Sequence, residues 1–88
     1  SLNNLKHVSA SQDTLIGYFK DAKNNTDGYM ITNFSEPSKN LTDDIELLFE
    51  NHKKVRIYQK GKCTEQKLTK GKLSLSLTAG DGAFVIAV

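Results

Sequence analysis

The chain has 88 residues, of which 38% are hydrophobic and 25% are charged. A chain of this length buries only about 60–65% of its unfolded surface, so we expect a single domain with a single core. The composition excludes a disordered tail, and the longest apolar run, residues 83–88, is far shorter than the roughly 20 residues of a membrane helix. The single cysteine, Cys63, excludes an internal disulfide and a multi-cysteine zinc site.

The formal net charge of +2 is unevenly distributed along the chain. Residues 1–50 hold four basic and eight acidic residues, whereas residues 51–88 hold eight basic and two acidic residues. We expect the acids of residues 43–50 and the bases of residues 53–62 to lie on neighbouring or facing strands, where they partly neutralise each other.

The first half of the chain alternates short apolar runs with turn residues. Residues 1–12 are polar and are interpreted as a linker or edge segment, followed by one β-domain over residues 13–88. Residues 14–19 are apolar on both faces, which predicts a central strand. Residues 21–28 end in an Asp-Gly pair typical of a hairpin turn. A second strand over residues 29–34 ends before Pro37, which lacks a backbone donor.

The next segment can be read in two ways. Ile45, Leu47 and Phe49 alternate with polar residues, which predicts a strand over residues 44–49. A helix over residues 41–50 is the alternative, because a polar residue able to cap a helix precedes acidic residues there. The apolar period is nearer two than 3.6, so we favour the strand.

The second half repeats the strand-and-turn pattern. Strands are expected over the ranges 54–59, 64–68, 73–77 and 83–88. The last of these is apolar on both faces, which predicts a central strand. About seven strands with turn signals every 8 to 12 residues are typical of an all-β fold, here an antiparallel β-sandwich. The predicted shared core consists of Leu15, Phe19, Ile31, Ile45, Leu47, Val55, Ile57, Leu73, Leu75, Phe84 and Ile86.

The sequence contains no recognisable catalytic constellation. His7 and His52 have no cysteine or glutamate at metal-ligand spacing, so both are interpreted as surface histidines. The carboxylates at residues 43, 44 and 46 fit a solubilising strand face better than an acid–base pair. Cys63 has no activating neighbour and is interpreted as incidental. We therefore predict no catalytic, cofactor-binding or metal-binding residue and no cofactor, and the ligand-binding residues remain open.

Two binding functions can be weighed from the residues alone. A single-stranded nucleic acid could bind the basic half around Tyr58, but lysine outnumbers arginine eleven to one and nearby acids can pair with Lys54 and Arg56. Sugar binding needs exposed aromatic platforms, yet the chain has no tryptophan, and Tyr18, Tyr29 and Tyr58 lie within strands. The residues therefore favour a domain that packs against protein.

Three runs resemble the C-terminal β-sandwich of bacterial glycoside hydrolases. They are GYMITNFSEP at residues 28–37, VRIY at residues 55–58, and LSL at residues 73–75 leading into AGDGAFV at residues 79–85. In such enzymes a strand ending in asparagine opens the sandwich, and a leucine-rich strand, a Pro-Gly-Glu-Gly-like turn and a Phe-Val strand close it. The catalytic carboxylates of these enzymes lie in a separate barrel domain, so the resemblance assigns none to this chain.

The resemblance implies a non-catalytic accessory domain that packs against the catalytic domain of the same polypeptide and stabilises it. The chain stops on an apolar strand and lacks an initiator methionine, which fits the C-terminal piece of a larger protein. An independent carbohydrate-binding module is the second hypothesis, and a nucleic-acid-binding barrel is the third. We expect a carbohydrate to be a possible partner, but neither nucleic acid nor a membrane, and the localisation is left open.

Overall fold

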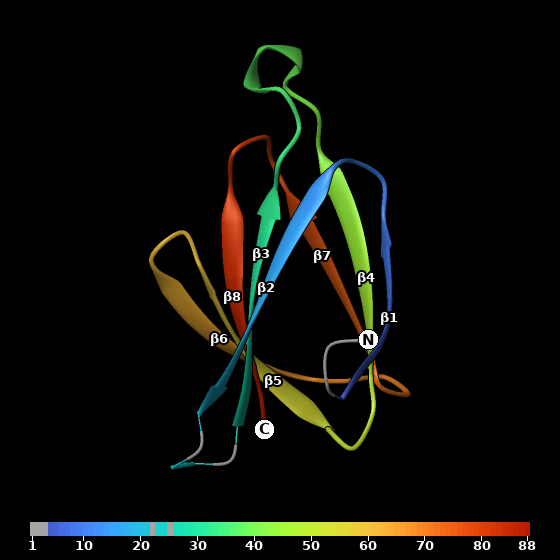
Figure 1. Cartoon of the computed structure of the whole chain (residues 1–88), viewed down its shortest axis with the longest axis vertical. Helices are drawn as coiled ribbons and strands as arrows, with labels where there is room; N and C mark the ends of the chain where they lie inside the picture. Colours follow the sequence, from blue (N-terminus) through green and yellow to red (C-terminus); the bar gives the residue numbers. More distant parts are fainter. Residues whose placement is uncertain (1–3, 22, 25) are drawn as a thin grey trace.

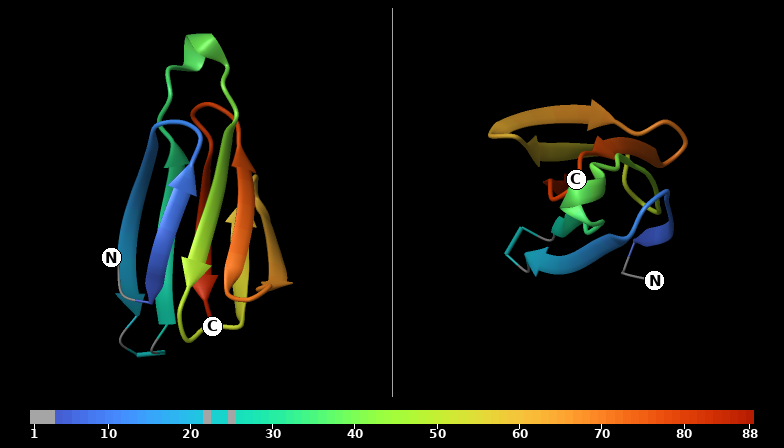
Figure 2. Two further views of the ribbon diagram at one scale, coloured as in Figure 1. Left: turned by 90° about the vertical axis from the view of Figure 1, so that its right-hand side faces the viewer. Right: turned by 90° about the horizontal axis from the view of Figure 1, so that it is seen from above.

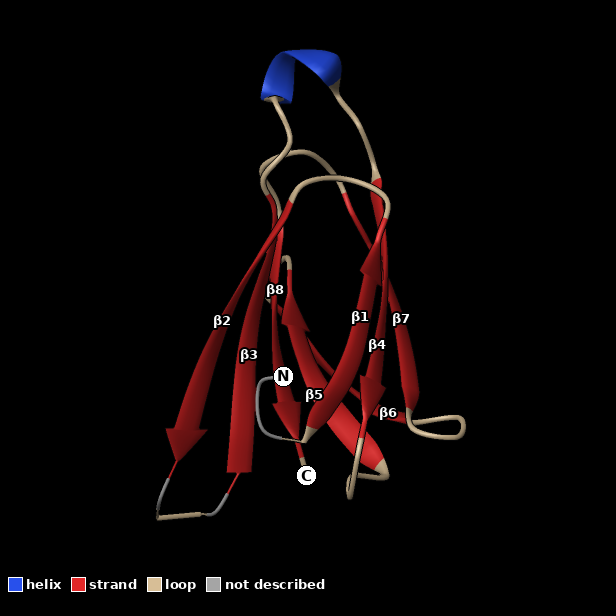
Figure 3. Cartoon of the chain, turned by 45° about the vertical axis from the view of Figure 1, so that its right-hand side comes forward, coloured by secondary structure: helices blue, strands red, loops and turns tan. Residues whose placement is uncertain are grey.

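The structure of the chain, a computed structural model, describes residues 4–21, 23–24 and 26–88. In this part of the chain eight strands and one short 3-10 helix follow one another (Figures 1 and 3). The elements are β1 (Leu5–Ala10), β2 (Thr14–Asp21), β3 (Thr26–Asn33), η1 (Pro37–Lys39), β4 (Asp43–Phe49), β5 (Lys54–Gln59), β6 (Lys62–Lys67), β7 (Lys72–Leu77) and β8 (Gly82–Ala87). The segment that could have been a helix is therefore the strand β4.

The strands form two antiparallel sheets. One sheet has the order β1-β4-β7, and the other has the order β2-β3-β8-β5-β6. The sheets face each other in a sandwich-like arrangement, and η1 lies in a loop that projects beyond one end (Figures 1 and 2). The predicted all-β class with antiparallel sheets is confirmed. The described residues form eight strands rather than about seven, because Leu5–Ala10 forms β1 at the edge of the smaller sheet.

The core lies between the sheets and is built by the alternating strands. β4, β5 and β7 bury every second residue, as their sequence alternation predicts. Seven residues of the predicted core are buried: Ile31, Ile45, Leu47, Val55, Ile57, Leu73 and Leu75. The other buried apolar residues are Leu5, Tyr29, Phe49, Leu77, Ala83, Val85 and Ala87.

Strand β2 lies at an edge of the five-stranded sheet and pairs only with β3. Ile16 and Tyr18 pack against the core, whereas Leu15 and Phe19 on the opposite face are 59% and 56% exposed. The prediction of a central strand with Leu15 and Phe19 in the core is wrong. A strand that is apolar on both faces has no alternation from which its inner face can be identified.

Strand β8 is central in its sheet, between β3 and β5, as predicted. However, Phe84 and Ile86 point away from the core and are only half-buried, so their placement in the core is wrong. The inner face of β8 carries smaller residues, because larger residues on the neighbouring strands already fill the space beside it. The directly opposite pairs are Tyr29 with Val85, Ile31 with Ala83, and Val55 with Ala87.

The hairpin between β2 and β3 is shorter than predicted. β3 begins at Thr26, so Asp27 and Gly28 belong to the strand and not to the turn. A Cβ atom at Gly28 would lie 3.0 Å from the Phe84 ring, so a larger residue there would displace that ring. The tight turn between β5 and β6 is confirmed: Lys60 and Gly61 both have positive φ, as in the two-residue turns that match strand twist.

The charged strand faces pair differently from the prediction. Lys54 and Arg56 on β5 lie 3.3 and 3.7 Å from Glu65 on β6, and Glu46 on β4 lies 3.6 Å from Lys72 on β7. β4 and β5 belong to different sheets, so among the described residues the acids of β4 do not pair with Lys54 or Arg56. The expected pairing of the β4 acids with Lys54 and Arg56 is therefore wrong.

Two buried polar side chains hold the loops at one end of the sheets. Asp43 accepts hydrogen bonds from the backbone N–H groups of Ser11 and Gln12, both at 3.1 Å, and from the Thr14 hydroxyl. Asn33 donates to the carbonyl oxygens of residues 41 and 77, both at 2.9 Å. Asp43 is thus no part of a solubilising face, although Asp44 and Glu46 are exposed as expected.

Candidate interaction surface

The outer face of the five-stranded sheet carries an exposed apolar surface. Directly opposite residues of paired strands share a face, so the register assigns this surface residue by residue. We call its uncharged part the outer apolar face; its members are Leu15, Gly17, Phe19, Gly28, Met30, Thr32, Gly82, Phe84, Ile86 and Tyr58. Three of these positions are glycines, which have no side chain, so the surface is recessed between the large side chains.

Aromatic rings form a row across this face. Phe84 on the central strand lies between Phe19 on β2 and Tyr58 on β5, with ring centroids 6.2 and 6.3 Å away. The rings are tilted by 57° and 46° to that of Phe84, so they do not form one flat platform. Met30, directly opposite Phe84 on β3, is 42% exposed and extends the apolar surface.

Charged residues border the aromatic row on one side. Lys54 and Arg56 on β5 and Glu65 and Lys67 on β6 share the outer face and are all exposed. Tyr58 lies directly opposite Cys63. A hydrogen bond with the Cys63 side chain, together with the electrostatic interaction between the two groups, raises the pKa of the Tyr58 phenol. An apolar, aromatic centre beside a charged rim is the composition of protein–protein interfaces.

This surface was not predicted from the sequence, because four of its residues, Leu15, Phe19, Phe84 and Ile86, were expected in the core. Of the three tyrosines, Tyr58 is 41% exposed, Tyr29 is fully buried and Tyr18 is half-buried on the inner face. Of these, only Tyr58 is an exposed residue. The signal for an outer surface was the doubly apolar pattern of β2 and β8, which equally fits a strand covered on both sides.

A second cluster surrounds the buried carboxylate of Asp27 on β3. The Asp27 carboxylate accepts hydrogen bonds from the Tyr18 hydroxyl at 2.6 Å and from the Asn4 amide at 2.8 Å, and it lies 3.0 Å from His52 Nε2. Lys20 Nζ lies 3.6 Å from the same carboxylate. His52 is only 12% exposed, so its interpretation as a surface histidine is wrong, whereas His7 is exposed.

The cluster stabilises the ionised form of Asp27. Burial opposes ionisation, but the hydrogen bonds from Tyr18, Asn4 and His52 and the charge of Lys20 outweigh it and hold the pKa of Asp27 far below its usual range. Burial, with the nearby charges of Asp27 and Tyr18, raises the pKa of Tyr29. The cluster joins the residue before β1 to β2, β3 and the β4–β5 loop.

The remaining features of the chain and the comparisons with known proteins do not assign a further functional site. Within the described ranges there is no group of three or more histidine, cysteine, aspartate or glutamate side chains suited to a metal ion, and no helix that could cross a membrane. No protein family, no curated protein and no solved structure matches the chain.

Proposed function

We propose that the chain is a non-catalytic accessory β-sandwich domain that packs against the catalytic domain of a glycoside hydrolase in the same polypeptide and stabilises it. The observation that carries the proposal is the outer apolar face, where Leu15, Phe19 and Met30 are exposed beside Phe84. Exposed apolar patches of this kind on a small soluble domain mark sites of contact with other proteins. The glycoside hydrolase itself is suggested by the sequence runs that resemble the C-terminal sandwiches of such enzymes.

Ring geometry favours a protein partner over a sugar on this face. A pyranose ring stacks on a flat aromatic surface, whereas Phe19, Phe84 and Tyr58 are mutually tilted. Tilted rings with a methionine and aliphatic side chains between them suit the irregular surface of a folded domain. An independent carbohydrate-binding module remains the second candidate, because Tyr58 and Phe19 are both exposed aromatic residues.

The proposal is tested by comparing thermal unfolding of the full polypeptide with that of this chain alone. Phe19→Ser removes a central contact of the proposed interface, and Leu41→Ser removes an exposed apolar side chain in the loop between η1 and β4. We expect Phe19→Ser to lower the Tm of the full polypeptide by several degrees and to leave the isolated chain within about 2 °C of the unchanged one. Leu41→Ser should change neither.

Three results would overturn the proposal. One is a gene that encodes no catalytic domain together with this chain. Another is an equal Tm for the full polypeptide with and without Phe19→Ser. The third is saturable binding of a neutral oligosaccharide that Tyr58→Ala abolishes, which would replace the docking role by the carbohydrate-binding role.

A further inference from the structure

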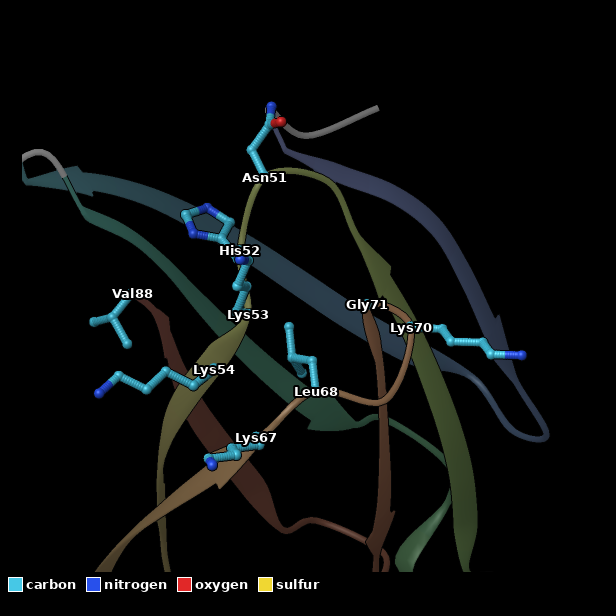
Figure 4. A pocket seen from close by; sticks show the side chains of 9 residues that line it. All are labelled: Asn51, His52, Lys53, Lys54, Lys67, Leu68, Lys70, Gly71 and Val88. Atoms are coloured by element: carbon cyan, nitrogen blue, oxygen red, sulfur yellow. The ribbon is translucent and has the colours of Figure 1, made fainter.

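An open groove lies where the β4–β5 loop meets the turn between β6 and β7, and it includes Lys54 and Lys67 from the charged border of the aromatic row (Figure 4). Its volume is about 720 Å³, within the range of small-molecule sites. Four lysines line it, Lys53, Lys54, Lys67 and Lys70, and none of its lining residues is an aspartate or glutamate. Leu68 supplies an apolar floor.

The lysines of the groove are poorly compensated by acids of the chain. Of the four lysines that line the groove, only Lys54 has a carboxylate partner among the described residues, Glu65 at 3.3 Å, and Lys53, Lys67 and Lys70 have none. Moreover, Lys54 and Lys67 are directly opposite each other on β5 and β6. Like charges in directly opposite positions destabilise a strand pair, and an anion bound between them would relieve this repulsion.

The arrangement of the lysines limits the shape of the ligand. In Figure 4 the side chains of Lys54 and Lys67 extend on the same side of the groove, whereas Lys70 extends away on the opposite side. The positive charges are thus spread across the groove instead of converging on one point. Lys53, Lys54 and Lys67 nevertheless offer three separate ammonium groups, and a ligand that meets these three carries several negative groups.

The lining residues narrow the chemical class further. No tyrosine, phenylalanine or tryptophan lines the groove, and its one aromatic ring, that of His52, is only 12% exposed, so successive bases of a single-stranded nucleic acid would find no row of rings on which to stack. The N–H of Leu68 donates to Lys53, and the N–H of Val88 donates to Lys54. These two backbone donors inside the groove are already used, so a peptide strand could not pair with them.

We propose that this groove binds an acidic oligosaccharide whose carboxylates pair with Lys53, Lys54 and Lys67. The polyanionic part of this inference stands on the groove and its lysines. The choice of a saccharide rests on the proposed function, since an accessory domain of a sugar-hydrolysing enzyme would hold a charged substrate chain near the catalytic domain. Side-chain ammonium groups at exposed positions imply weak binding, with a dissociation constant on the order of 1 mM.

Titration of the chain alone, followed by NMR, tests the proposal with trigalacturonate as the probe and maltotriose as its uncharged counterpart. We expect saturable shifts around residues 53, 54 and 67 with trigalacturonate and none with maltotriose. Lys67→Gln should weaken binding about three- to fivefold, and Lys53→Gln with Lys67→Gln about tenfold or more. Raising the salt concentration from about 0.05 to 0.5 M should also weaken it, because salt screens exposed charges.

Lys62→Gln is the matched control, since this lysine is exposed on the same strand β6 but lies outside the groove. It should bind trigalacturonate as the unchanged chain does. The proposal is overturned if trigalacturonate does not bind at 10 mM, if Lys62→Gln weakens binding as much as Lys67→Gln, or if citrate binds equally well. None of these results bears on the docking of the catalytic domain, because the experiment contains only this chain.

Discussion

Asp27 connects parts of the chain that are distant in sequence. Its carboxylate contacts Asn4, Tyr18, Lys20 and His52, and these lie on three different segments. Asp27→Asn keeps the shape but replaces an acceptor oxygen by a donor, which leaves buried donors without a partner. We expect a loss of about 2–3 kcal/mol in the free energy of unfolding, measured by urea denaturation at pH 7. An unchanged midpoint would show that the cluster does not stabilise the fold.

The same carboxylate makes stability depend on pH. Because the pKa of Asp27 is lower in the folded chain than in the unfolded chain, the unfolded chain binds the proton first as the pH falls. The contribution is therefore complete above about pH 5 and is lost progressively below about pH 4. We expect the stability difference between the unchanged chain and Asp27→Asn to shrink between pH 5 and pH 2. A constant difference over this range would contradict the assignment.

Tyr29 presents the opposite situation, a buried polar atom without a partner. Its ring is fully buried and packs against Tyr18 and Phe49, with centroids 5.4 Å away in both cases. Its hydroxyl makes no hydrogen bond within the described structure. Tyr29→Phe should therefore leave the free energy of unfolding unchanged or raise it by up to about 1 kcal/mol. Tyr29→Ala should lower it by about 3–5 kcal/mol, because it opens a cavity in the core.

At the scale of elements, two glycines in turns, Gly61 and Gly71, differ in how closely their surroundings pack against them. Gly61 and Gly71 both have positive φ, so alanine strains the backbone at either position. A Cβ atom at Gly71 would also lie 2.7 Å from the Phe49 carbonyl oxygen, whereas at Gly61 it would meet nothing within 4 Å. We expect Gly61→Ala to cost about 1 kcal/mol and Gly71→Ala clearly more, as measured by thermal unfolding. Equal costs would show that the β6–β7 turn does not pack against β4.

The strands differ in how far their sequence determined their place. β4, β5 and β7 alternate apolar with polar residues, so both their existence and their inner faces were predictable. β2 and β8 are apolar on both faces, and only the sheet order decides that β2 is an edge and β8 is central. The volumes of the side chains decide which face of β8 points into the core, since Ala83 and Ala87 fit there and Phe84 does not.

At the scale of the whole molecule, the all-β class was predictable but the candidate sites were not. The outer apolar face depends on the order β2-β3-β8, which joins the second, third and eighth strands of the chain. The Asp27 cluster likewise joins residues as far apart as 25 positions, Asp27 and His52. The excess of basic residues in the second half of the chain indicated a basic surface, but the position of the groove lined by lysines follows from the pairing of β5 with β6.

Hydroxyl-radical footprinting of the full polypeptide and of this chain alone tests the proposed docking most directly. It reports the solvent accessibility of individual side chains, including Phe19, Met30 and Leu41. We expect Met30 and Phe19 to react several times more slowly in the full polypeptide, because a catalytic domain covers them, while Leu41 reacts equally in both. If Met30 and Phe19 react at the same rate in the full polypeptide as in the chain alone, the outer apolar face does not dock the catalytic domain.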